Sequence, residues 1–164
     1  MKTKKKLDIV RFASRGSNSF IKTVTIRVNA YFNQRNISPY ANTAMWIKTA
    51  VMMLLYFVPY LLMVTGTAAG NAWLFFGYWF LMACGMSGIG TSIMHDANHG
   101  TYSHNKKVNN FISYILEVIG GYKVTWRIQH NVLHHTYTNI AGLDEDIDSM
   151  NLLRLSPQQP WRSV

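Results

Sequence analysis

The sequence TAVMMLLYFVPYLLMVTGTAAGNAWLFFGYWFLMACGMSGIGTSIM, residues 49–94, decides the fold because it contains no Asp, Glu, Lys or Arg. A membrane-spanning helix needs about 20 apolar residues, so this stretch has room for two spans and a tight turn. We predict a first span at about Thr43–Thr65, a short uncharged turn near residues 67–71 and a second span at about Ala72–Met94. Small residues near the end of the second span, Gly85 among them, would let another helix approach closely.

The charged residues lie outside this stretch and are unevenly distributed. The chain carries a formal net charge of +9, and residues 1–48 hold ten Lys or Arg against one acid, Asp8. Short Lys- and Arg-rich segments beside a span stay in the cytoplasm. We therefore predict a basic cytosolic segment at 1–42, two transmembrane helices within 43–94 and a cytosolic segment at 95–164. A nucleic-acid-binding arm is the alternative, but the adjacent span explains the charge more simply, and we expect no nucleic acid partner.

The segment before the first span has two further features. We expect no cleavable signal peptide, because Leu7–Gly16 carries charged residues where an apolar run should be. Residues 17–32 alternate cations with apolar side chains, a pattern that suits a helix or strand lying on anionic lipid headgroups. The lone Cys84 cannot form an intrachain disulfide, which indicates chemistry that faces a reducing compartment.

All six histidines lie between residues 95 and 135, and five of them form two groups. The groups are His95-Asp96-Ala97-Asn98-His99 and His130-Asn131-Val132-Leu133-His134-His135. Residues four apart on a helix share a face, so each group can close on one metal ion. His135 is rotated by about 100° from His134 at 3.6 residues per turn, so it would face a different direction, toward a second ion. The repeated spacing beside a membrane exit predicts a dinuclear site with the ligands His95, His99, His130, His134 and His135.

The residue types narrow this prediction only in part. Imidazole suits iron, zinc and copper alike, so the ligands alone do not choose the metal. A zinc protease would need His-Glu-x-x-His with the glutamate as general base, whereas Asp96 and Asn131 occupy that position in the two groups. His104 stands alone in a polar loop, and we expect it to be a solvated loop histidine.

Both groups resemble the histidine boxes of a known enzyme family. His95-Asp-Ala-Asn-His99, at the end of a predicted transmembrane hairpin, resembles the first box of membrane fatty acid desaturases. His130-Asn-Val-Leu-His134-His135-Thr-Tyr-Thr-Asn, followed by Asp144-Glu-Asp-Ile-Asp148, is similar to the second box of bacterial acyl-lipid or linoleoyl-CoA-type desaturases. The resemblance extends over essentially the whole chain. It implies an all-α integral membrane fold of four transmembrane helices with a cytosolic cap, of which this chain would supply half: a transmembrane helical hairpin followed by cytosolic histidine-bearing helices.

The resemblance also implies a reaction and its participants. The reaction is the O₂-dependent introduction of a double bond into an acyl chain, carried as acyl-CoA or acyl-lipid, at two iron ions. The five histidines would supply part of the ligand set, since they are too few for the family's complete set. It implies a bacterial inner (cytoplasmic) membrane with the boxes on the cytoplasmic side. Electrons would come from an external donor such as a ferredoxin or a cytochrome b5-like protein, because the sequence holds no redox-cofactor motif. A ligating imidazole usually donates its other N–H to a carboxylate or carbonyl. The candidates for that role are Asp96, Asn98, Asn131, Asp144, Asp146 and Asp148.

The sequence departs from the family pattern in one respect. The family's third box, a His or Gln followed after two or three residues by His-His, and its second hairpin are absent. We therefore expect the N-terminal portion of a desaturase, inactive as this chain. Two alternatives stay open: a histidine-box di-iron hydroxylase or ketolase, and a non-catalytic membrane fragment.

Overall fold

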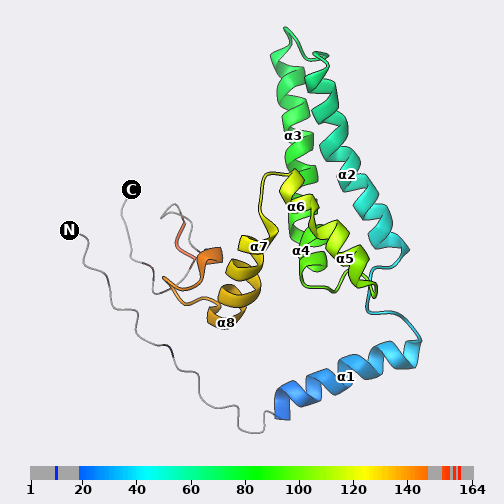
Figure 1. Cartoon of the computed structure of the whole chain (residues 1–164), viewed down its shortest axis with the longest axis vertical. Helices are drawn as coiled ribbons and strands as arrows, with labels where there is room; N and C mark the ends of the chain where they lie inside the picture. The colour runs from blue at the N-terminus through cyan, green and yellow to red at the C-terminus, as the bar shows by residue number, and fades with distance from the viewer. Residues whose placement is uncertain (1–9, 11–18, 148–152, 156, 158, 160–164) are drawn as a thin grey trace, which may run out of the picture. The chain divides into compact units, whose positions relative to one another are not determined.

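The computed structural model of the chain is helical, with no strand in the part that it describes (Figure 1). That part comprises Val10 and residues 19–147, 153–155, 157 and 159. The elements are α1 (Ser19–Arg35), α2 (Thr43–Val64), α3 (Ala72–Gly88), the π-helix η1 (Ile89–Met94), α4 (His95–Asn98), α5 (Lys106–Ser113), α6 (Ile115–Val118), α7 (Lys123–Trp126), the π-helix η2 (Arg127–His134), α8 (His135–Tyr137) and the 3-10 helix η3 (Glu145–Ile147). The chain divides into two compact units, residues 1–38 and 39–164, which are described separately. The expected all-α class is confirmed for the described residues.

The first unit contains helix α1, which overlaps the segment expected at residues 17–32; residues 17 and 18 lie outside the described part. The helix ends where Asn36 adopts a positive φ of 51°. The N–H of Ile37 donates to the carbonyl of Phe32 at 3.1 Å, and that of Asn36 to the carbonyl of Asn33 at 3.2 Å. These two bonds form a Schellman motif, which satisfies carbonyls that the last turn leaves without partners.

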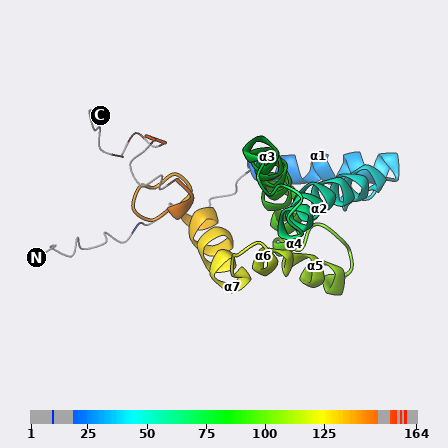
Figure 2. The same ribbon diagram turned by 90° about the horizontal axis from the view of Figure 1, so that it is seen from above.

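Helices α2 and α3 are the two long apolar helices of the second unit, and they pack side by side (Figures 1 and 2). The side-chain oxygens of Asn42 and Asn71 each accept a 3.0 Å hydrogen bond from the backbone N–H three residues on. Such N-caps satisfy donors of the first helical turn. A Cβ at Gly85 would lie 2.7 Å from the backbone nitrogen of Tyr56 and 2.9 Å from the carbonyl oxygen of Met52. The close approach predicted for the small residues is therefore confirmed at Gly85.

Both long helices are candidate membrane spans. Thr43–Val64 and Ala72–Asn98, the second of which runs through α3, η1 and α4, are long and apolar enough to cross a bilayer by length and composition. Only 6% and 11% of their apolar windows are buried within the protein. The core helices of a soluble domain bury their apolar side chains, and these do not. Their exposed apolar surface is suited to lipid.

The buried core of the second unit lies at the end of the second candidate span. Its members are Ile89, Ile93, Met94, Ala97, Tyr102, Ile112 and Leu116. They come from η1, α4, the following loop, α5 and α6, so the segment that carries the first histidine group is anchored in the core. Tyr102 joins this core to α2, because its hydroxyl lies 2.6 Å from Oγ1 of Thr49 and the ring of Trp46 meets its ring edge-on.

Candidate metal centre

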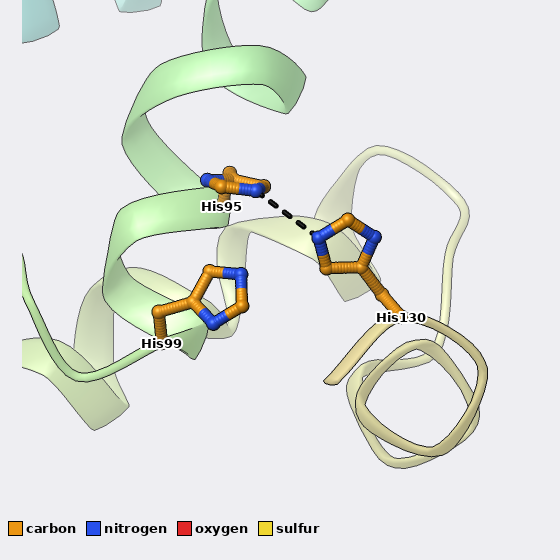
Figure 3. A group of neighbouring side chains, drawn as sticks. All are labelled: His95, His99 and His130. Carbon is orange, nitrogen blue, oxygen red and sulfur yellow. Dashed lines mark hydrogen bonds between the residues drawn. The ribbon is translucent and has the colours of Figure 1, made fainter. Parts of the chain in front are cut away.

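The two histidine groups come together in space (Figure 3). His95 and His99 project from the helical end of the second candidate span and face His130, which lies on η2. The Nε2 atoms of His95 and His130 are 3.1 Å apart, and those of His99 and His135 are 3.4 Å apart. The ring of His134 stacks on that of His130 with centroids 4.9 Å apart. All five histidines predicted as ligands therefore lie in one cluster.

This cluster contains two overlapping sets of three metal-binding side chains. Within each set the coordinating atoms lie within 4.8 Å of one another. The sets are His95, His99 and His130, and His130, His134 and Asp146. His130 belongs to both sets: its Nε2 lies 3.1 Å from Nε2 of His95, and its Nδ1 contacts Asp146. A cation in the second position would take the place of the proton between His130 and Asp146.

Gly100 ends the helix that carries the first histidine group. Its φ of +73° lies in the left-handed region, which glycine adopts without strain. The N–H of Gly100 donates to the carbonyl of Ala97 at 3.0 Å, and the N–H of Thr101 donates to the carbonyl of Asp96 at 2.9 Å. This pair of bonds forms a Schellman motif. The chain therefore turns away directly after His99 and leaves the first group at the helix end.

The second histidine group differs from its α-helical expectation, because His130 and His134 lie in the π-helix η2. In a π-helix the N–H of residue i+5 bonds the carbonyl of residue i, so a turn holds more residues than in an α-helix. His135 follows His130 by five positions, and its ring centroid lies 5.1 Å from that of His130 and 4.9 Å from that of His99. His135 lies in the same cluster as His134 but has a different neighbour: its Nε2 faces Nε2 of His99, whereas Nδ1 of His134 contacts Asp144.

Carboxylates contact three of the imidazoles through Nδ1. The contacts between Nδ1 and carboxylate oxygen are His95 to Asp96 at 3.1 Å, His130 to Asp146 at 2.5 Å and His134 to Asp144 at 2.9 Å. Asp148, the remaining acid of the expected set, lies outside the described residues.

These contacts favour a cation between the rings. A carboxylate only accepts hydrogen bonds, so the imidazole that it contacts carries a proton on Nδ1 and, in its neutral form, presents a lone pair at Nε2. His95 and His130 are both held in this way, yet their Nε2 atoms are 3.1 Å apart. Two lone pairs at that distance cannot form a hydrogen bond, whereas a metal ion would accept both. The donor set therefore fits a bound metal.

His99 is kept neutral by its surroundings. Burial is the largest cause that lowers the pKa of His99, followed by the charges that the neighbouring rings of His95, His130 and His135 would carry. The carboxylate of Asp96 acts in the opposite direction, and the resulting pKa is about 4. At neutral pH the imidazole of His99 is unprotonated, the form in which it can bind a metal.

Comparison with known proteins places this cluster in a family. The sequence model of the family described as fatty acid desaturase matches residues 71–164, which include both histidine groups. The chain belongs to the fatty acid desaturase family. Desaturases are oxidoreductases, and the two long apolar helices of this chain agree with a membrane protein.

Three curated desaturases illustrate the similarity. The sn-1 linoleoyl-lipid 6-desaturase of Arthrospira platensis is 38% identical over 89% of this chain and 39% of its own length. The protein of the same name from Synechocystis sp. is 31% identical over 85% of this chain and 38% of its length. The acyl-lipid (8-3)-desaturase of Physcomitrium patens is 30% identical over 92% of this chain and 32% of its own length. The chain thus spans two fifths or less of these relatives. No solved structure matches it.

The two histidine groups are linked by Trp126 and Arg127. These two residues were not assigned to the site from the sequence. Nε of Arg127 donates to Oδ1 of Asn98 at 3.0 Å, and the ring of Trp126 stacks on that of His130 at 4.5 Å. Nδ2 of Asn131 donates to the carbonyl of Asn98 at 3.3 Å. Among the described residues, Asn98 and Asn131 thus connect the two helices and form no hydrogen bond to an imidazole. Trp126 and Arg127 lie about one turn before His130. This spacing is the feature of the sequence that could have identified them as neighbours of the site.

Asp144 is the most buried carboxylate that contacts the histidine cluster. Its side chain is fully buried; Oδ1 accepts from Nδ1 of His134 and from the N–H of Asp146, and Oδ2 accepts from the N–H of Asn139. Burial raises the pKa of Asp144, but these hydrogen bonds outweigh burial and leave the pKa below its ordinary value. The carboxylate is therefore ionised at neutral pH and keeps the proton of His134 on Nδ1.

We expect Asp144→Asn to weaken the binding of Fe²⁺ by about 10–100-fold. This is the usual loss of metal affinity when the hydrogen-bond partner of a metal-binding imidazole is removed. Asparagine keeps the shape but replaces one acceptor oxygen by an NH₂ group, which would face the N–H of Asn139 or of His134. Anaerobic titration of the purified chain in lipid nanodiscs measures the affinity. Glu145→Gln is the matched control, because Glu145 bonds Gln129 and no imidazole. An equal loss in both variants would contradict the role of Asp144.

Proposed function

We propose that these residues are part of an acyl-lipid desaturase, which uses O₂ to introduce a double bond into the acyl chain of a membrane lipid. The observation that carries this proposal is the cluster of five imidazoles at the end of a candidate span, in a chain of the desaturase family. The curated relatives are named as desaturases of acyl-lipid or linoleoyl-lipid. Those names support a lipid-linked acyl chain over acyl-CoA as the substrate.

The proposal includes a membrane topology. Helix α2 and the helix that runs from α3 to α4 would form a transmembrane hairpin in the inner membrane of a bacterium. Residues 1–42 would be cytosolic because they are strongly basic. Two crossings return the chain to the side from which it started, so residues 95–164, with both histidine groups, would be cytosolic as well.

The histidine cluster would hold iron. Its ligands would be His95, His99, His130, His134 and His135, and imidazole is a ligand that suits iron. When bound, iron would supply the O₂-dependent removal of two hydrogens from adjacent methylenes. Asp96, Asp144 and Asp146 would hold the proton of three imidazoles on Nδ1, so that Nε2 is available as a ligand.

The remaining contacts would fix geometry. The bond between Arg127 and Asn98 sets the separation of the two ligand-bearing helices, and Trp126 covers one face of the His130 ring. Positioning of this kind matters, because small displacements in an active site cost large factors in rate. Electrons would come from a separate protein such as a ferredoxin or a cytochrome b5-like donor.

A chimera tests the proposed function. Residues 1–164 would replace the matching portion of the Arthrospira platensis protein, and fatty acids of an expressing host fed linoleate would be analysed by gas chromatography. We expect a product with one additional double bond, and none when His99 is replaced by alanine. A hydroxylated product without a new double bond would overturn the proposal. Residues 1–164 alone, whose five imidazoles are few for two ions, are expected to bind fewer than two irons per chain and to form no product.

A further inference from the structure

Helix α1 has an apolar face that no described residue of its own unit covers. Six apolar residues recur at positions that bring them to one side of an α-helix, about 100° per residue apart. They are Phe20, Ile21, Val24, Val28, Tyr31 and Phe32. Five of the six are exposed, from 41% for Val24 to 70% for Phe20, and Phe32 is half-buried. A continuous exposed apolar face on a helix indicates an interaction surface.

The charges of α1 show which kind of surface would cover this face. The helix carries Lys22, Arg27 and Arg35 and no acidic residue. The guanidinium of Arg35 lies over the ring of Tyr31, 4.7 Å from its centroid, at the last residue of the helix. Residues 1–18 of the sequence add six Lys or Arg against one acid. An apolar face combined with cations alone is complementary to an anionic lipid surface.

We propose that α1 lies in the headgroup layer of an anionic bilayer, with its apolar face at the acyl boundary and its cations on lipid phosphates. The sequence favours lipid phosphates over an acidic protein as the partner of these cations. Only residues 36–42 separate α1 from α2, the first candidate membrane span. The chain therefore holds α1 near a membrane surface. This proposal is independent of iron binding and of desaturation.

Two labelled variants test the position of α1. In the full chain carrying Cys84→Ser, a single cysteine replaces either Val24, on the apolar face, or Asn33, which lies about 180° away at 3.6 residues per turn. A fluorescent label at each site is quenched by nitroxide lipids in vesicles of phosphatidylcholine with one third phosphatidylglycerol. We expect the Val24 label to lie about 5–10 Å below the headgroups and the Asn33 label to remain in water.

The role of charge is tested by Lys22→Gln and Arg27→Gln. We expect each to lower the ratio of bilayer-bound to free α1 roughly fivefold, and high salt to act in the same direction. Equal quenching of the Val24 and Asn33 labels would overturn the proposal. Quenching of the Val24 label that is unchanged in pure phosphatidylcholine would overturn the anionic preference. A Val24 label that nitroxide lipids fail to quench at a high protein-to-lipid ratio would indicate that a second copy of α1, and not lipid, covers the apolar face.

Discussion

We expect His130→Ala to cause the largest loss of metal binding of any single histidine substitution. His130 belongs to both sets of candidate donors, so its removal leaves two donors in each set. Replacing His95 or His99 leaves the set with Asp146 complete, and replacing His134 leaves the other set complete. The affinity for Fe²⁺ should therefore fall by more than the roughly 10–100-fold expected when an imidazole only loses its hydrogen-bond partner.

Spectroscopic titration with Co²⁺, with iron analysis in parallel, measures this effect on the chain in nanodiscs. His104→Ala is the control, because His104 is exposed, lies outside both sets and meets only the ring edge of Tyr40 among the described aromatic contacts. Circular dichroism verifies that each variant keeps its helices. The shared role of His130 would be contradicted if His134→Ala weakened binding as strongly.

The course of the two long helices could be predicted because hydropathy and capping act locally. The uncharged stretch predicted helices that begin at about Thr43 and Ala72, and α2 and α3 begin at these residues. The caps Asn42 and Asn71, which were not predicted from the sequence, precede them directly. The position of the buried core could not be predicted. Apolar residues such as Ile112 and Leu116 look alike in sequence whether they face lipid or protein, and only the fold places them against η1.

The histidine cluster was predictable for a similar reason, and its fine geometry was not. Spacing of four residues brings His95 and His99 to one helix face, which is a local property. The sequence predicted α-helical spacing for His130 and His134, whereas both lie in the π-helix η2. The contact of Asp146 with His130 depends on a loop that folds back, so Asp146 could be predicted only as one candidate among several acids.

Tyr102→Ala is expected to cause the largest loss of stability, roughly 3–5 kcal/mol, the range for removing a buried aromatic side chain. The side chain of Tyr102 is almost fully buried, packs in the core and meets Trp46 edge-on at 5.1 Å. It joins α2 to the loop that follows the first histidine group, since its carbonyl accepts from the N–H of Ala41 at 3.0 Å and its hydroxyl contacts Thr49. Thermal unfolding in detergent, followed by circular dichroism, measures the loss.

Tyr102→Phe separates ring packing from the hydroxyl contact. It removes only the 2.6 Å contact with Thr49, whose Oγ1 also donates to the carbonyl of Met45 at 2.9 Å and so keeps a partner. The expected cost is therefore that of one hydrogen bond, about 0.5–1.5 kcal/mol. Because Tyr102→Ala would loosen the segment that positions His95 and His99, it should also weaken Fe²⁺ binding, whereas Tyr102→Phe should leave binding unchanged. Equal losses of stability in the two variants would mean that the hydroxyl contact, and not the packed ring, holds the first histidine group against α2.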